Sequence, residues 1–121
     1  MQVKIDTKEN FHVFYIQESN LTANMTEELQ FRLLTYLQNP VKNIVLNCKD
    51  IIFIDDAAAE TLISLQQKFY EQHASFVICG LQPKVEEALD KTGLLEIMNV
   101  VPTESEAGDI VLMEEIEREL I

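Results

Sequence analysis

The fold of this chain is decided by residues 44–59, which read IVLNCKDIIFIDDAAA. Residues 43–48 form a short and nearly continuous apolar run, which is typical of a β-strand covered on both faces. A second apolar run at residues 51–54 is followed by Asp55-Asp56 and then by a helical pattern. The apolar residues of that pattern share one face and are Ala58, Leu62, Leu65 and Phe69. The centre of the chain therefore predicts a buried strand followed by an amphipathic helix.

The N-terminal part of the chain predicts a hairpin and a first helix. Residues 3–7 and 11–17 alternate between apolar and polar side chains, and residues 8–10 between them suit a turn. The period becomes helical near Asn24, which has capping-box spacing with Glu27. The apolar stripe of this helix comprises Met25, Leu29, Leu33, Tyr36 and Leu37. Pro40 ends it, because proline cannot continue a helix.

The region after the central helix predicts a strand, a short helix and a weaker strand. Residues 75–79 have the composition of another buried strand. Pro83 at the first helical position and Gly93 just past the end bracket a short helix. Residues 96–101 predict a last, weaker strand.

A final helix completes the predicted order of elements. Thr103 with Glu106 has capping-box spacing. The apolar stripe that we expect to pack comprises Ile110, Met113, Ile116 and Leu120. The order is therefore β-β-α-β-α-β-α-β-α, without repeat or linker, which predicts one domain over residues 1–121 with a mostly parallel or mixed sheet.

Composition narrows the classes of partner. The chain has 21 acidic and 9 basic residues and a formal net charge of −12, which argues against binding a nucleic-acid backbone. The sequence has neither the apolar core of a signal peptide nor the ~18 apolar residues of a membrane span. We therefore expect a cytoplasmic protein without direct membrane insertion. Cys48 and Cys79 each end an apolar run, which predicts buried free thiols.

Asp55-Asp56 is the most conspicuous candidate for chemistry. Carboxylates at a helix start accept hydrogen bonds from free backbone N–H groups, so we interpret the pair first as a cap. A metal or acid–base site needs further ligands, and the two histidines fall in separate elements. We expect His12 on an exposed strand face and His73 at the end of the second helix, with neither a metal nor a cofactor.

Other patterns also point away from catalysis. The three glycines are isolated, so no phosphate-binding loop is predicted, and there is no G-x-S-x-G motif. A phosphoacceptor receiver domain would need acidic residues after its first strand and a late lysine, and neither is in place. The acidic run at residues 114–119 is interpreted as the solvated face of an amphipathic helix, with partner docking as the alternative.

Three blocks in order across residues 3–100 resemble one known family. The first is Ser19-Asn20-Leu21-Thr22 followed by Glu27-Glu28-Leu29. The second runs from Ile44-Val45-Leu46-Asn47 through Phe53-Ile54-Asp55 into the second helix. The third runs from Pro83-Lys84-Val85 through Leu89 to Thr92-Gly93-Leu94. In this order and spacing the blocks resemble the STAS family, the domain of anti-sigma factor antagonists.

The resemblance implies a fold and a function. The fold is α/β, with a mixed four- to five-stranded sheet and about four helices packed mainly on one face. The function is a non-enzymatic module that binds a protein partner, typically an anti-sigma factor with a histidine-kinase-like ATPase domain. In the family this binding is switched by phosphorylating a serine at the start of the second helix, which adds about −1.5 to −2 charge.

The sequence departs from the family at this switch. Where the family has Asp-Ser-Ser-Gly, this chain has Asp55-Asp56-Ala57-Ala58, so the phosphoacceptor position is Ala57 and carries no hydroxyl. Asp56 either imitates a permanent phosphate incompletely or only caps the helix. Ala58 replaces a glycine and allows the backbone less freedom. The usual serine switch therefore cannot operate here by its ordinary chemistry.

The resemblance also implies where a partner would bind. The expected partner-binding residues are Ser19, Asn20, Thr22, Asp55, Asp56, Ala57, Ala58 and Thr61. Within this set, Ser19 and Thr22 replace a glycine and an acidic residue of the family pattern. Whether Thr61 or Ser64 serves as a substitute phosphoacceptor stays open.

The sequence leaves three candidate functions. The leading hypothesis is an antagonist-like or scaffolding module that binds a cytoplasmic protein without the serine switch. The alternative is a STAS-type scaffold subunit of a transporter-associated or stressosome-like complex. The third is a small acid–base or phosphoryl-transfer enzyme using Asp55 and Asp56, for which the sequence offers no second catalytic group.

Overall fold

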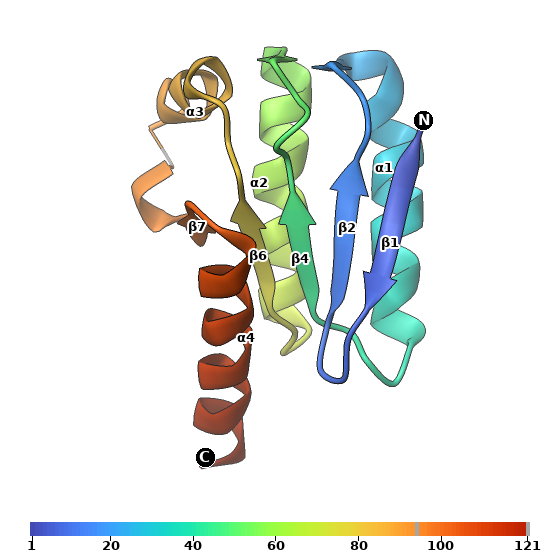
Figure 1. Cartoon of the computed structure of the whole chain (residues 1–121), viewed down its shortest axis with the longest axis vertical. Coiled ribbons are helices and arrows are strands. Elements are labelled where there is room, and N and C mark those ends of the chain that lie inside the picture. Colours follow the sequence, from blue (N-terminus) through green and yellow to red (C-terminus); the bar gives the residue numbers. More distant parts are fainter. Residues whose placement is uncertain (94, 121) are drawn as a thin grey trace.

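A five-stranded mixed β-sheet forms the centre of the structure, a computed structural model that describes residues 1–93 and 95–120 (Figure 1). In spatial order its strands are β1 (Val3–Thr7), β2 (His12–Ile16), β4 (Ile44–Asn47), β6 (Phe76–Cys79) and β7 (Val100–Val101). β1 runs antiparallel to β2, and the other neighbouring strands run parallel. The predicted N-terminal hairpin and mixed sheet are confirmed.

Helices and two short strands connect and cover this sheet. The helices of the described chain are α1 (Ala23–Leu34), α2 (Asp56–Glu71), α3 (Pro83–Asp90) and α4 (Glu104–Glu119), with short 3₁₀ helices η1 (Thr35–Gln38) and η2 (Leu95–Ile97). Outside the main sheet, β3 (Asn20–Leu21) pairs in parallel with β5 (Phe53–Ile54). The last predicted strand is therefore shorter than residues 96–101, and Leu94 of the third resembling block lies outside the described residues.

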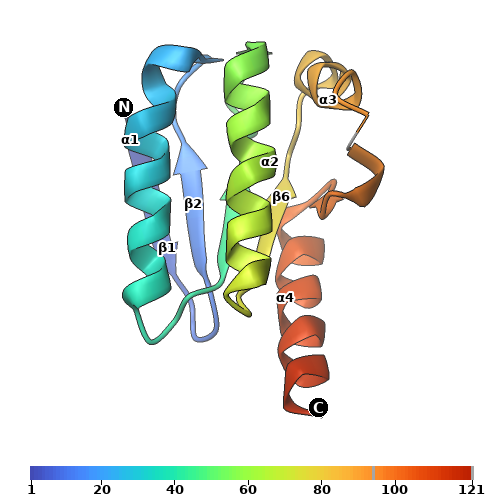
Figure 2. The same ribbon diagram turned by 180° about the vertical axis from the view of Figure 1, so that it is seen from behind.

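The two faces of the sheet carry separate cores. Strand β4 is buried throughout, as its apolar run predicted. Its Ile44 and Leu46 belong to the large core with α1, α2 and α3, whereas Val45 belongs to a smaller core with α4. In Figure 2, α1 and α2 lie in front of the sheet. Alternate residues of a strand point to opposite faces of the sheet, so β4 contributes to both cores. Helices α1, α2 and α3 pack on one face and α4 packs on the other.

The predicted stripes of the first two helices are confirmed, but the cap of α1 is not. Leu29 and Leu33 of α1 are fully buried, as are the four apolar positions predicted for α2: Ala58, Leu62, Leu65 and Phe69. However, α1 begins at Ala23 with Thr22 at the N-cap, so Asn24 already lies inside the helix and forms no capping box. The later predictions hold, because Pro83 opens α3 and the Thr103 hydroxyl accepts from the Glu106 N–H at 3.2 Å.

The expectation that His12 lies on an exposed strand face is wrong. Its side chain is buried, and its Nε2 donates to the Val41 carbonyl oxygen at 3.0 Å. Its Nδ1 lies 3.0 Å from Thr7 Oγ1, and its ring packs against Tyr36 of η1. The segment after α1, which includes Tyr36 and Val41, therefore covers His12, a position that the alternation of apolar and polar residues in the strand predicts to be exposed. His73 lies just past the end of α2, as predicted, in a left-handed conformation with φ of 59°.

Helix α4 packs through a different face from the one predicted. Its buried residues are Ala107, Gly108 and Val111. The expected stripe is largely outside: Met113, Ile116 and Leu120 are 59%, 58% and 81% exposed, and only Ile110 packs partly on the smaller core. Small residues at the contact allow a close approach, such that a Cβ on Gly108 would lie 3.1 Å from the Phe11 ring.

The interpretation of residues 114–119 as a solvated face is correspondingly wrong for three of them. Glu114, Glu115 and Arg118 turn inward and hydrogen-bond Tyr70, Asn43 and Ser75 respectively, whereas Glu117 and Glu119 are exposed. The physical reason is that polar groups buried beneath α4 need partners, and the acidic positions supply them. Across residues 1–93 and 95–120, no helix has the length and apolar character needed to cross a membrane.

Candidate functional site

Two segments that are distant in the sequence meet beyond the end of the main sheet. Residues 19–22, which precede α1, lie beside residues 52–55, which precede α2, through the parallel pairing of β3 and β5. The Ile52 N–H donates to the Ser19 carbonyl oxygen at 2.8 Å, and the Asp55 N–H donates to the Leu21 carbonyl oxygen at 3.1 Å. The structure thus brings together the two segments that contain the sequence-predicted binding residues. We call this surface the α1/α2 tip.

Asp55 fixes the geometry of the α1/α2 tip. It is the N-cap residue of α2, and its Oδ1 accepts from the Ala58 N–H at 2.9 Å. Its Oδ2 accepts from the Ala23 N–H, in the first turn of α1, at 2.8 Å. Because the first amides of a helix have no partner within the helix, one carboxylate here satisfies a free donor of each helix.

The predicted binding residues differ in exposure. Ser19, Asn20, Asp56 and Ala57 are exposed, and Thr22, Asp55 and Thr61 are half-buried. Ala58 is fully buried, so it supports the tip from beneath and offers no surface of its own. The Thr61 hydroxyl donates to the Ala57 carbonyl oxygen at 2.9 Å, which places it within the first turns of α2.

Sequence reasoning missed two apolar residues of the tip. Ile52 and Phe53 are 57% and 52% exposed, although they sit in an apolar run that predicts burial. Both precede the buried Ile54, which anchors β5 to the core. The sequence carried little signal for this exposure, because it depends on the β3–β5 ribbon, whose strands are two residues long.

Lys84 and Lys91 were also not assigned to the candidate site from the sequence, although they lie beside the start of α2. A hollow of about 570 Å³ separates the start of α2 from α3, and its lining includes Phe53, Asp56, Lys84 and Lys91. The carboxyl ends of the parallel strands β4 and β6 point to the same edge of the sheet, which brings the start of α3 beside the start of α2 (Figure 1). The α1/α2 tip and this adjoining hollow therefore combine exposed apolar side chains with charges of both signs.

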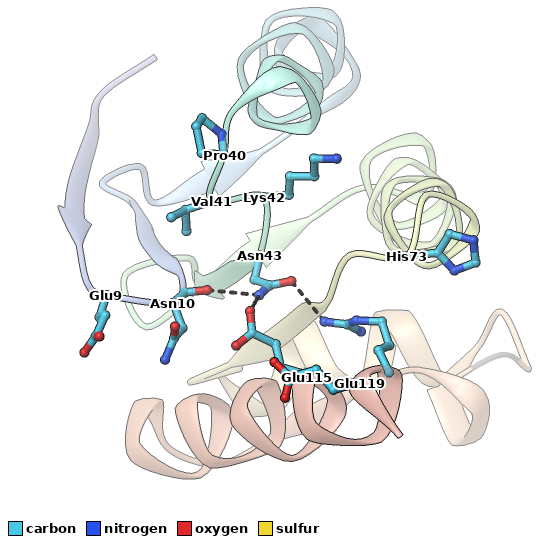
Figure 3. Close-up of a pocket in the computed structure, with 10 residues that line it drawn as sticks. Glu9, Asn10, Pro40, Val41, Lys42, Asn43, His73, Glu115 and Glu119 are labelled. Atoms are coloured by element: carbon cyan, nitrogen blue, oxygen red, sulfur yellow. Dashed lines mark hydrogen bonds between the residues drawn. The ribbon is translucent and has the colours of Figure 1, made fainter. Parts of the chain in front are cut away.

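A second hollow of about 430 Å³ lies at the opposite end of the sheet, where a buried amide organises the lining (Figure 3). The Asn43 Nδ2 donates to the Asn10 carbonyl oxygen at 2.9 Å and to Glu115 Oε1 at 2.7 Å. Its Oδ1 accepts from the Ser75 N–H at 2.8 Å, and Arg118 donates to the Ser75 hydroxyl at 3.1 Å. These groups satisfy one another, so this cluster holds α4 on the sheet.

The cysteines are placed as predicted. Cys48 and Cys79 are free and buried on neighbouring chain segments, and burial raises the pKa of both thiols, that of Cys79 to about 12. A thiol that resists ionisation is a poor nucleophile. Among the described residues, no three His, Cys, Asp or Glu side chains gather in a way that could hold a metal ion.

Several solved structures share this fold. RsbS of Moorella thermoacetica, solved as a variant, superposes with a TM-score of 0.78 at 20% identity and covers 98% of this chain and 99% of its own. The anti-sigma factor antagonist SpoIIAA, in its unphosphorylated form, gives a TM-score of 0.74 at 17% identity over 91% and 96% of the two chains. The murine anion transporter Slc26a9 gives 0.70 at 13% identity, covering 88% of this chain but 18% of the transporter.

A protein-family model matches over most of the sequence. The model is described as the STAS domain and matches residues 2–107 of the 121. The match includes the whole sheet, the helices α1, α2 and α3, and the α1/α2 tip, and it ends within α4. This chain therefore belongs to the STAS domain family.

Proposed function

We propose that this chain is a regulatory protein-binding module that docks its partner on the α1/α2 tip, as the anti-sigma factor antagonists that it resembles would. The observation that carries the proposal is the exposure of Ile52 and Phe53 beside Asp56 and Ala57. Neighbouring large apolar side chains that are about half exposed to solvent are typical of a surface that a partner protein covers. The partner-facing set comprises Ser19, Asn20, Thr22, Asp55, Asp56, Ala57 and Thr61, resting on Ala58.

The module would bind without the serine switch of the family. Ala57 is exposed at the first turn of α2 but carries no hydroxyl, so a kinase-like partner has nothing to phosphorylate there. The nearby Thr61 hydroxyl already donates to the backbone within its helix. Asp56 places one permanent negative charge beside this position, and we propose that it sets a fixed binding state. The natural partner is an anti-sigma factor with a histidine-kinase-like ATPase domain.

The arrangement of Asp55 supports a binding role over an enzymatic one. Both of its carboxylate oxygens accept backbone N–H groups of helix starts, at 2.8 and 2.9 Å. A carboxylate whose two oxygens both accept backbone amides at helix starts has a structural role as a cap. We propose that the chain acts as one STAS-like domain in the cytoplasm, where its two buried cysteines would stay reduced.

A scaffold subunit of a transporter-associated or stressosome-like complex is the second candidate. The similarity to a domain-sized part of Slc26a9 favours it, because a STAS-like fold there forms a fraction of a larger chain. A module without a phosphoacceptor also suits a permanent assembly. The two candidates share the α1/α2 tip and differ in what covers it.

Affinity capture with tip variants tests the proposal. The immobilised chain is compared with the double variant Ile52→Ser/Phe53→Ser and with Phe31→Ser, a control that removes a 72% exposed phenylalanine from α1. We expect a kinase-like ATPase to bind the wild type and the control and to be lost from the double variant. Recovery of membrane-complex subunits with the same dependence favours the scaffold, and equal recovery by all three proteins would contradict docking at the tip.

The captured ATPase then tests the missing switch. Incubation with ATP should leave the mass of the wild-type chain unchanged, whereas Ala57→Ser should gain one phosphoryl group. Phosphorylation of the wild type would show that another hydroxyl has replaced the family serine, and mapping would identify it among Thr61 and Ser64.

A further inference from the structure

Helix α4 packs on the protein through small apolar residues and several acidic side chains, and it leaves most of its large apolar side chains exposed to solvent. On its inward side, Glu104 accepts from the hydroxyl of Tyr15 in β2 at 2.6 Å, and Glu114 accepts from the hydroxyl of Tyr70 in α2 at 2.7 Å. Glu115 accepts from Asn43 at 2.7 Å. These hydrogen bonds fix the rotation of the helix about its axis. The apolar side cannot turn inward without breaking them.

The outward side carries four large apolar residues. They are Leu112, Met113, Ile116 and Leu120, which are 39%, 59%, 58% and 81% exposed. Leu112 and Met113 precede Ile116 by four and three residues, and Leu120 follows it by four, so all four lie on one side of the helix, and we call them the α4 stripe. Within the described residues no part of the chain covers it. Four adjacent exposed apolar side chains in a helix that is otherwise well anchored indicate a binding surface.

The charges around the α4 stripe determine which kind of partner it fits. Its exposed charged neighbours on the helix are Glu106, Asp109, Glu117 and Glu119, all acidic. The one basic side chain of α4, Arg118, faces the sheet and donates to Ser75 at 3.1 Å. A second copy of this chain would bring an equally acidic rim against the first, in a protein with net charge −12. Like charges across an interface oppose such a dimer.

We propose that the α4 stripe binds a basic amphipathic helix of a partner protein. Apolar residues of that helix at i, i+3, i+4 and i+7 would cover Met113, Ile116 and Leu120, and its flanking Lys or Arg side chains would pair with the acidic rim. Helix α4, which carries the stripe, lies on the opposite face of the sheet from α1 and α2 and extends away from the start of both helices (Figures 1 and 2). It is thus a second docking surface, independent of the one proposed above.

A defined peptide tests this surface in the full chain. The probe is a fluorescent peptide of about eighteen residues, built from leucine and lysine with leucine at the helical contact spacing. We expect saturable binding by fluorescence anisotropy, weakened about tenfold or more by Ile116→Ser, which removes one large contact. Phe31→Ser is the matched control, because it removes a large apolar residue of α1 that is 72% exposed, against 58% for Ile116, and should leave the affinity unchanged.

Charge variants distinguish the contribution of the exposed acidic residues beside the α4 stripe from that of the overall negative charge of the chain. Glu117→Gln should weaken binding about two- to threefold, and more at low salt, whereas Glu86→Gln on α3 removes the same charge from another exposed site and should have no effect. Equal weakening by both, equal weakening by Ile116→Ser and Phe31→Ser, or no binding would overturn the proposal. So would a concentration-dependent dimer that Ile116→Ser dissociates, because a second copy would then cover the stripe.

Discussion

The carboxylate of Asp55 accepts a hydrogen bond from the Ala23 amide at 2.8 Å, across 32 residues of sequence. The same side chain caps its own helix through the Ala58 amide at 2.9 Å. Thr22, the N-cap residue of α1, makes no side-chain hydrogen bond to its helix. The start of α1 therefore depends on a residue from the start of α2, and the α1/α2 tip is one structural unit.

Replacing Asp55 should destabilise the protein more than an ordinary cap replacement. Loss of one N-cap side chain costs about 0.5–2 kcal/mol, and Asp55→Ala removes a hydrogen bond from each of two helices, so we expect about 2–3 kcal/mol. The neighbouring Asp56→Ala is the control, because Asp56 is exposed and does not cap, and it should change the free energy of unfolding by less than about 0.5 kcal/mol. Urea unfolding measures both, and equal losses would refute the shared cap.

The sequence predicted part of this arrangement. The position of Asp55 at the end of an apolar run and before a helical period was enough to predict a cap for α2. Its bond to Ala23 was not predictable, because it depends on the parallel pairing of β3 and β5, which are two residues each and leave almost no pattern. The exposure of Ile52 and Phe53 was missed for the same reason.

Removing the buried amide of Asn43 should loosen α4. The buried Ser75 N–H would lose its partner, which costs about 1–3 kcal/mol, and the half-buried Asn10 carbonyl would lose a hydrogen bond as well, so we expect Asn43→Ala to lose about 2–3 kcal/mol (Figure 3). Asn39→Ala, at an exposed position, provides the control and should stay within about 0.5 kcal/mol. Urea unfolding measures the free energy of unfolding of both variants. Similar denaturation midpoints for Asn43→Ala and Asn39→Ala would show that the Asn43 cluster does not anchor α4.

Two glycines with the same backbone angle should tolerate alanine differently. Gly80 and Gly93 have φ of 74° and 75°, so alanine is strained at both by about 1–2 kcal/mol. At Gly80 a Cβ would also lie 3.1 Å from Asn47 Oδ1 and 3.3 Å from the Lys49 backbone nitrogen, whereas at Gly93 it meets no described atom within 4 Å. Gly80→Ala should therefore be less stable than Gly93→Ala by about 1 kcal/mol or more in thermal unfolding. The reverse order would contradict the close packing after β6.

The rotation of α4 shows where sequence patterns fail. Apolar periodicity assigned Met113, Ile116 and Leu120 to the core, as it correctly assigned Leu62 and Leu65 of α2. The difference lies in the face of the sheet that each helix meets. The side under α2 is apolar, but the side under α4 includes polar groups of Tyr15, Asn43 and Asn47, which hydrogen-bond acidic side chains of α4. The sequence of a helix taken alone does not show which residues the helix packs against in the fold.

Stability should fall at alkaline pH, and Tyr15 should account for part of the loss. Its hydrogen bond to Glu104, followed by its burial, raises the pKa of Tyr15 to about 12, compared with about 10 in an unfolded chain. Burial and the hydrogen bond to Glu114 raise the pKa of Tyr70 as well. Between the two values the folded state keeps a proton that the unfolded state has released, so the free energy of unfolding decreases as pH rises above about 10.

The variant Tyr15→Phe isolates this effect, because it removes the titrating hydroxyl and keeps the ring. We expect it to be less stable than the wild type near neutral pH by about 1 kcal/mol, since the bond to Glu104 is lost. From about pH 9 to about pH 11 its free energy of unfolding should decrease less steeply than that of the wild type. Urea unfolding at each pH gives both slopes. Since the buried thiols and Tyr70 titrate equally in both proteins, parallel slopes would mean that Tyr15 ionises alike in the folded and unfolded chains.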